Sequence, residues 1–272
     1  MSNVIVLGLS GPSCAGKTTI ALCLLKLFPQ TVVIHQDNYY KNDAQIPIDP
    51  ETQLQDWDCP AAFDMQKLTN DICETRSLLE SQTHPSDANS PSTHASQWAN
   101  PPENIDSIMG PDSLKSLQQL VRTKFGLSNP ETTPFSIILL DGILLFHKTA
   151  LSQGGCHPGS ICDTGVFIYA HYSTLKNRRN GRSGYATKDG IWVDPPGYFD
   201  NTVWPNFIKF HPQFVDHNGE IISAGSQSAY DLDNDLSWRD KVIVCSSDMP
   251  IKKTIELCID TLANEWNRRR MH

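Results

Sequence analysis

The sequence predicts one α/β domain, residues 1–272, in which a five-stranded parallel sheet carries helices on both faces. Short apolar segments rich in Val, Ile and Leu alternate with segments whose apolar residues recur at helical spacing, a pattern typical of covered parallel sheets. A glycine-rich turn separates the first strand segment from the first helical one. The length, with 39% hydrophobic and 19% charged residues, suits one globular core.

Five short segments have the composition of buried parallel strands, which are apolar over their whole length. They are residues 4–9, 31–35, 136–140, 165–170 and 241–245. A first helix is expected over 18–28, ending at Pro29. A last helix is expected after Pro250, and its basic residues 268–270 suit the negative end of a helix dipole.

The segment from about residue 81 to 113 is rich in Ser, Pro, Asn, Thr, His and Asp and lacks apolar periodicity. This composition predicts a disordered or loosely packed surface insertion. A short helix is expected to follow, because Leu114, Leu117, Val121 and Phe125 share one face before Gly126. Residues 128–134 are expected to form a polar loop.

The net charge and the cysteine pattern restrict the binding partners and the compartment that can be expected. The net charge of −8 disfavours nucleic acids and anionic membranes, and no apolar run is long enough to span a bilayer. The eight cysteines form no CxxC pair and no signal peptide is evident, so reduced thiols in the cytoplasm are expected, with the nucleus as a further compartment. We expect small-molecule partners, and we favour a monomer.

Residues 11–18 match G-x-x-x-x-G-K-[ST] at every fixed position. The glycines let backbone N–H groups surround phosphate oxygens, Lys17 supplies a positive charge, and the Thr18 hydroxyl suits Mg²⁺. The motif predicts a P-loop NTPase-type fold with ATP and Mg²⁺ as cofactors, and the alternative is a chance match in a tight turn. The predicted nucleotide contacts here are Gly11, Ser13, Ala15, Gly16, Lys17, Thr18 and Thr19.

Carboxylates follow two predicted strands, at the sheet edge where α/β proteins bind ligands. Asp37 there could orient an acceptor hydroxyl and take its proton, or hold Mg²⁺ through water; alternatively it caps the next helix. Asp141 occupies the usual place of a second metal-orienting acid, with a turn residue as the alternative. For Asp58, before Pro60, helix capping and substrate binding remain equally open.

A basic cluster over residues 176–182 stands out in an acidic chain. Followed by Tyr185 and glycines, it suits a lid at about 176–198 that neutralises phosphate charge during transfer. The alternative is a solvated helix face.

Several blocks together resemble the uridine kinase-like P-loop kinases and, within them, the nicotinamide riboside kinases. The blocks are residues 8–19, 36–40, 57–58, 141–146, 178–179, and 196–200 with 203–205. The last block, Pro-Gly-Tyr-Phe-Asp followed by Val-Trp-Pro, is the most specific. The resemblance leaves out residues 81–134 and much of 149–163 and 216–238.

The resemblance implies an ATP-dependent kinase that phosphorylates the ribose 5′-hydroxyl of nicotinamide riboside in NAD salvage. It implies Asp37 as general base assisted by Lys17, and adenine near residues 246–248. The implied substrate contacts are Asp37, Tyr40, Trp57, Asp58, Arg179 and Tyr185; the implied lid contacts to ATP are Arg178 and Arg182; the implied metal residues are Thr18, Asp37 and Asp141.

Aromatic residues suit this acceptor physically, because a pyridinium cation over an aromatic ring gains about 0.5–2 kcal/mol per contact. The same walls predict acceptance of nicotinic acid riboside. Two departures from the family stand out: Asp141 replaces the usual Glu, so metal contact could run through water, and one extra residue lies near 183–184. The rival interpretations are a uridine/cytidine kinase and a nucleotide-binding regulatory protein without transfer activity.

Overall fold

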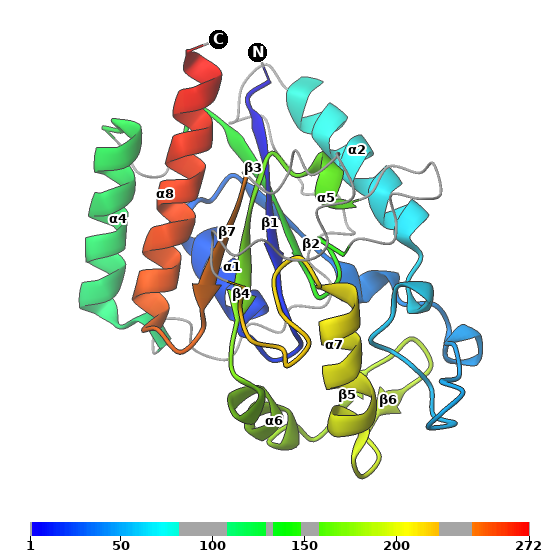
Figure 1. Cartoon of the computed structure of the whole chain (residues 1–272). Helices are drawn as coiled ribbons and strands as arrows, with labels where there is room; N and C mark the ends of the chain where they lie inside the picture. The colour runs from blue at the N-terminus through cyan, green and yellow to red at the C-terminus, as the bar shows by residue number, and fades with distance from the viewer. Residues whose placement is uncertain (1, 82–107, 129–132, 148–157, 223–240, 272) are drawn as a thin grey trace.

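The computed structural model describes residues 2–81, 108–128, 133–147, 158–222 and 241–271 (Figure 1). Five parallel strands form one sheet in the order β2-β3-β1-β4-β7. Their bounds are β1 Val4–Ser10, β2 Thr31–His35, β3 Ser136–Gly142, β4 Thr164–Tyr169 and β7 Val242–Ser246. The five-stranded parallel sheet is therefore confirmed.

Helices cover both faces of the sheet, as predicted (Figure 1). One face carries α1 (Lys17–Leu27), α4 (Pro111–Phe125) and α8 (Ile251–Arg270). The other carries α2 (Met65–Ser81), α5 (Pro158–Ile161) and α7 (Trp204–Phe210).

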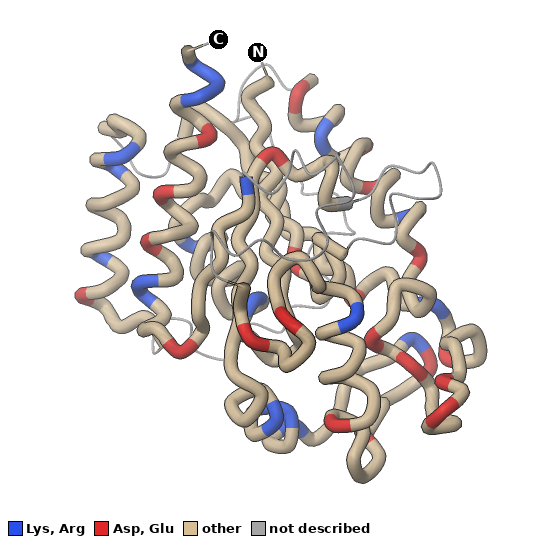
Figure 2. Tube along the Cα trace, in the orientation of Figure 1, with Lys and Arg blue, Asp and Glu red and all other residues tan. Residues whose placement is uncertain are grey.

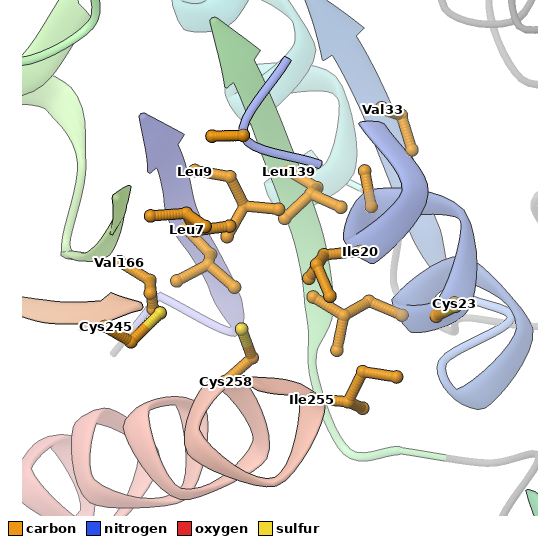
Figure 3. Packing of buried hydrophobic residues seen from close by; sticks show 14 of the residues in the cluster. Leu7, Leu9, Ile20, Cys23, Val33, Leu139, Val166, Cys245, Ile255 and Cys258 are labelled. Carbon is orange, nitrogen blue, oxygen red and sulfur yellow. The ribbon is translucent and has the colours of Figure 1, made fainter. Parts of the chain in front are cut away.

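The core divides between the two faces because successive strand residues point to opposite sides. In β1, Leu7 and Leu9 pack on the face covered by α1 and α8, and Figure 3 shows them in one cluster with Ile20 of α1 and Ile255 of α8. Val6, the residue before Leu7, packs on the other face with α2 and α7. Each central strand is buried along its whole length, which explains why its residues are mostly apolar.

Several short elements lie beyond the carboxyl ends of the strands. They are the 3₁₀ turns η1 (Gln36–Tyr39), η2 (Asp43–Gln45) and η3 (Pro60–Ala62), helix α6 (Tyr172–Asn180), the antiparallel hairpin of β5 (Tyr185–Ala186) and β6 (Ile191–Trp192), and the π-helical turn η6 (Phe199–Val203). The hairpin was not expected from the sequence.

The predicted insertion over 81–113 needs a correction at its end. Helix α4 begins at Pro111, directly after Gly110, whose φ of +70° is a value that favours glycine. Proline is well accommodated at a first helical position, so residues 111–113 are helical rather than loosely packed. Residues 82–107 lie outside the described residues, as do residues 129–132 of the expected polar loop. The expected helix before Gly126 is α4 itself.

All the cysteines in the described ranges are free thiols, as predicted, whereas Cys156 lies outside them. Among the described helices, none combines the length and apolar character needed to cross a bilayer.

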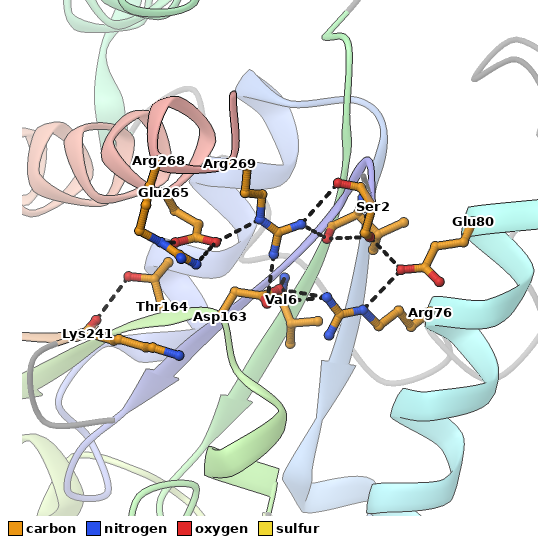
Figure 4. A network of polar contacts seen from close by, with 11 residues as sticks. Ser2, Val6, Arg76, Glu80, Asp163, Thr164, Lys241, Glu265, Arg268 and Arg269 are labelled. Atoms are coloured by element: carbon orange, nitrogen blue, oxygen red, sulfur yellow. Dashed lines mark hydrogen bonds and ion pairs between the residues drawn. The ribbon is translucent and has the colours of Figure 1, made fainter. Parts of the chain in front are cut away.

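The amino edge of the sheet is held by an ion-pair network around Asp163 (Figure 4). This carboxylate accepts the backbone N–H of Val6 at 2.8 Å and pairs with Arg76 of α2 at 3.2 Å and Arg269 of α8 at 2.7 Å. Arg269 also donates to the carbonyl oxygen of Val4 at 2.7 Å. The network joins helices from opposite faces at the edge remote from the carboxyl ends of the strands.

Candidate active site

A pocket of about 500 Å³ lies at the carboxyl ends of β1, β2 and β3, a volume typical of small-ligand sites. It gathers most of the predicted site residues: Ser13, Gly16, Lys17, Thr18, Thr19, Asp37, Tyr40, Trp57, Asp58, Asp141, Arg179, Arg182 and Tyr185. Gly11, Ala15 and Arg178 were also predicted but do not line it.

The phosphate-binding loop connects β1 to α1, as its motif predicts. Gly11 has a φ of +141°, and a Cβ atom there would lie 2.0 Å from the carbonyl oxygen of Ile168 in β4. Only glycine fits this close approach of two backbones. Gly16, at a φ of +91°, directs the chain into α1, whose positive amino end faces the pocket.

Lys17 is buried beneath this loop, and its ammonium group donates to the carbonyl oxygen of Pro12 at 2.8 Å. Burial lowers its pKa, although the charges of Asp141 and Asp37 oppose that effect. Phosphate oxygens would favour the charged form of this lysine still further.

Asp141, at the carboxyl end of β3, is the centre of a polar cluster. Its Oδ2 accepts a hydrogen bond from Thr18 Oγ1 at 2.6 Å, and a hydrogen bond of 3.0 Å joins the same oxygen to His35 Nδ1. Strand register explains the second contact, because His35 of β2 lies directly opposite Asp141. Burial would raise the pKa of Asp141, but the His35 hydrogen bond and the Lys17 charge outweigh it and lower that pKa.

Asp37 lies in η1, directly after β2, and lines the pocket. The residue that precedes η1 as its cap is His35, so Asp37 does not cap the turn. The residue as a whole is exposed to water at the pocket, although protein atoms gather around its carboxylate and partly desolvate it. This desolvation, reinforced by repulsion from Asp141 and opposed by Lys17, raises the pKa of Asp37.

Aromatic side chains form part of the pocket wall. The rings of Tyr40 and Trp57 meet edge to face at 5.4 Å, and Trp57 lies 5.6 Å from Trp192. Tyr40 is also stacked on Phe63 at 4.1 Å, which fixes its ring. Such a wall suits a flat or cationic ring.

Asp58 and Arg179 also line the pocket, and both are more than nine-tenths buried. Arg179 Nη2 lies 3.7 Å from Asp58 Oδ2, and the guanidinium is held more closely by Asp194, with Nε at 2.6 Å from Oδ2. Burial raises the pKa of Asp58 to about 6, against the opposing charge of Arg179. The residue that caps η3 is Cys59, so the capping alternative for Asp58 finds no support.

The basic cluster belongs to α6 and the turn after it, and Figure 2 shows its positive charges gathered on that helix. Tyr185 receives two guanidinium groups on its ring, Arg179 at 4.7 Å and Arg182 at 5.2 Å. Arg178 instead lies behind the phosphate loop, where it donates to the carbonyl oxygen of Cys14 at 3.3 Å and to Ser247 Oγ at 2.9 Å. It thereby joins the loop to residues 246–248.

The sequence analysis missed several pocket residues. Trp192 and Lys188 come from hairpin β5–β6, which was not foreseen because its strands have only two residues each. Asp194 follows the hairpin and had no motif to mark it. The alternation of Ile191, Trp192 and Val193 was the available signal, since Trp192 is partly buried between two exposed apolar residues.

The oxygen donors of the pocket fit Mg²⁺, which prefers carboxylates, hydroxyls and phosphate oxygens. Thr18 and Asp141 already share a hydrogen bond, and Asp37 is close enough for its charge to act on both Lys17 and His35. Among the described residues, no three acidic, His or Cys side chains form a metal site by themselves. An ion here would therefore take further ligands from the nucleotide.

Several nicotinamide riboside kinases are similar to this chain over most of its length. The nicotinamide riboside kinase of Saccharomyces cerevisiae is 32% identical over 257 residues, covering 93% of each chain. That of Schizosaccharomyces pombe is 29% identical, covering 80% of this chain and 84% of its own, and human nicotinamide riboside kinase 1 is 27% identical, covering 84% and 87%.

No protein-family model matches the chain. Among solved structures, a sugar kinase from Janibacter aligns over 95% of this chain and 94% of its own at 14% identity, but its TM-score of 0.35 is too low to inform the fold. The relatives found by sequence are sufficient to assign the family, since the Saccharomyces cerevisiae protein is 32% identical along nearly the whole chain. This chain belongs to the nicotinamide riboside kinase family.

Proposed function

We propose that this protein transfers the γ-phosphoryl group of ATP to the 5′-hydroxyl of nicotinamide riboside, giving ADP and nicotinamide mononucleotide in NAD salvage. The observation that carries the proposal is a single pocket lined by residues of a complete phosphate-binding loop, by Asp37 and by several aromatic side chains. The names of the relatives support the same reaction.

The phosphate side would act by positioning and by charge. The backbone N–H groups of residues 11–18 and the amino end of α1 bind phosphate oxygens, and Lys17 neutralises charge that develops on the transferred group. Thr18, Asp141 and Asp37 would hold Mg²⁺ directly or through water, and the ion would offset the negative charge of the phosphates.

Asp37 would orient the 5′-hydroxyl for in-line attack and accept its proton at a carboxylate oxygen. Phosphoryl transfer depends mostly on such alignment, because the loose transition state needs little covalent help from the protein. A pKa raised by desolvation and by Asp141 also suits a general base, since it increases the affinity of the carboxylate for the proton.

The acceptor side would recognise both parts of the nucleoside. Asp58 and Arg179 offer a carboxylate and N–H donors to the ribose hydroxyls, and the rings of Tyr40, Trp57 and Tyr185 surround the pyridinium ring. These contacts do not depend on the carboxamide, so nicotinic acid riboside would also be a substrate.

Residues of about 176–198 would act as a lid over the transferring phosphates, with Arg182 and Arg178 close to the nucleotide. The contacts of Arg178 with Cys14 and Ser247 support this, because they connect the phosphate loop with the region proposed to lie by the adenine.

The free cysteines of the described ranges are consistent with action in the cytosol.

The proposal is tested with ATP, Mg²⁺ and a panel of nicotinamide riboside, nicotinic acid riboside, uridine and cytidine. We expect the two pyridine ribosides to be preferred, and Asp37→Ala to lower kcat at least about 100-fold, as loss of a general base does. Glu256→Gln, a surface change in α8, is the matched control. Preference for uridine would indicate a pyrimidine kinase, and no turnover of any nucleoside would indicate a regulatory protein.

A further inference from the structure

We propose that Asp194 is a positioning residue for the acceptor site: it holds Arg179 ready for the ribose and, through Trp192, couples that arginine to the aromatic wall. This inference rests on the proposed function, because it assigns a role within the proposed riboside site.

The guanidinium of Arg179 is oriented by Asp194 rather than by Asp58. Two parallel hydrogen bonds join Arg179 to Asp194, from Nε to Oδ2 at 2.6 Å and from Nη2 to Oδ1 at 3.1 Å. This forked geometry fixes both the position and the plane of the group. The approach to Asp58 is longer, at 3.7 Å, and is an ion-pair contact only.

This division leaves hydrogen-bonding capacity free for a ligand. Two of the five guanidinium N–H bonds serve Asp194, and neither N–H bond on Nη1 of Arg179 has a hydrogen-bond partner within the described part of the chain. The carboxylate of Asp58 is not hydrogen-bonded to Arg179 either, since Oδ2 lies 3.7 Å from Nη2. A vicinal diol could therefore accept from Arg179 and donate to Asp58 without breaking the pair that holds the arginine.

Trp192 connects the same carboxylate to the ring side of the pocket. Its Nε1–H donates to Asp194 Oδ1 at 2.9 Å, so that this one oxygen accepts from both Trp192 and Arg179. The indole ring lies 5.6 Å from Trp57 and 5.5 Å from Tyr198, and it lines the pocket. Asp194 therefore links Arg179, which would bind the ribose, to Trp192, which would face the base.

The strand that carries Trp192 is anchored at its far end as well. The backbone N–H of Asp43 donates to Asp189 Oδ2 at 2.9 Å, and Thr187 Oγ1 donates to Asp43 Oδ2 at 3.1 Å. Hairpin β5–β6 is therefore held both by the loop that follows Tyr40 and by Asp194. A side chain anchored in this way loses little further freedom when a ligand binds, which favours affinity.

The test compares Asp194→Asn, Asp194→Glu and Trp192→Phe with Asp200→Asn as the matched control. Asp200 pairs at 2.7 Å with Lys176, which belongs to α6 as Arg179 does. Neither Asp200 nor Lys176 lines the pocket. KM and kcat are measured for nicotinamide riboside, its 2′-deoxy and 3′-deoxy analogues, and ATP. Thermal unfolding of each variant reports on folding.

We expect Asp194→Asn to raise the riboside KM about tenfold or more, the value of one charge-assisted hydrogen bond, with the ATP KM unchanged. Asp194→Glu should recover part of that loss. Trp192→Phe, which keeps a ring but loses the N–H donor, should raise the riboside KM by a smaller factor. Because Asp194 acts through Arg179, the penalty of Asp194→Asn should shrink for the deoxy analogue that lacks the hydroxyl bound by Arg179.

An unchanged riboside KM in Asp194→Asn would overturn the inference. So would an equal rise in the KM for ATP, or an equal penalty for the riboside and both deoxy analogues, because a merely structural role would produce those results. Wild-type turnover tests the proposed function separately. If the wild type prefers uridine, that function is wrong and the variants are compared on uridine, whose ribose carries the same hydroxyls; a wild type that phosphorylates no riboside overturns both proposals.

Discussion

Replacing Asp58 by Asn should make the folded protein more stable at neutral pH while weakening riboside binding. The carboxylate is buried, and burial raises its pKa from 3.8 to about 6 despite the nearby Arg179. The folded state therefore binds a proton at this group more tightly than the unfolded state does, so the ionised form costs folding free energy.

The magnitude follows from that pKa difference of about two, since each pH unit corresponds to about 1.4 kcal/mol. The cost is absent below pH 4, grows as pH rises toward 6, and remains near 3 kcal/mol above it, as an order-of-magnitude value. An Asn amide has the shape of the protonated acid and no charge. Its arginine neighbour is not left unpaired, because Asp194 holds Arg179 at 2.6 Å.

Urea denaturation of wild type and Asp58→Asn at pH 5 and pH 7.5 measures this effect. The stability gain should be about 3 kcal/mol at pH 7.5 and roughly half that at pH 5, and the riboside KM should rise at least about tenfold. Asp200→Asn is the control, since Lys176 lowers the pKa of Asp200 and its loss should not stabilise the protein. A variant less stable than wild type at pH 7.5 would refute the reasoning and would show the Asp58–Arg179 pair to be net stabilising.

Two further results are expected. As pH falls below about 6, Asp58 takes up a proton and the riboside KM should rise whereas the ATP KM should not; a riboside KM constant from pH 7.5 to 5 would contradict the assignment. Gly11→Ala should lower the free energy of unfolding by more than about 2 kcal/mol, because its Cβ would meet the Ile168 carbonyl at 2.0 Å with the backbone at a φ of +141°. Chemical denaturation measures this loss, and a stable, fully active variant would show that the loop can shift at little cost.

The regular elements of the fold could be predicted because their signals are local. Strand segments such as 31–35 and 136–140 consist mostly of Val, Ile and Leu, and Gly126, which has a left-handed conformation, marks the end of α4. The strand order could not be predicted, because it depends on contacts between segments far apart in sequence. The start of α4 was missed because a polar segment with prolines hides a helix whose buried face begins only at Leu114 and Leu117.

Within the site, motifs identified the residues proposed to bind phosphate, since a phosphate loop requires fixed residue types at fixed spacing. The register of β2 against β3 was needed to place His35 against Asp141. Asp194 and Trp192 escaped notice for a different reason: their role exists only through Arg179 and Trp57, which are distant in sequence and meet them only in the folded chain.

The contacts of Arg269 and Asp163 also bear on how the protein folds as it is synthesised. Asp163 precedes β4 and must remain without its α8 partner until the ribosome has produced that helix, roughly a hundred residues later. Domains generally fold as units, and the central strands emerge long before the arginine that closes their amino edge. The network around Asp163 can therefore be completed only after α8 has been synthesised, which makes it a late event in folding on the ribosome.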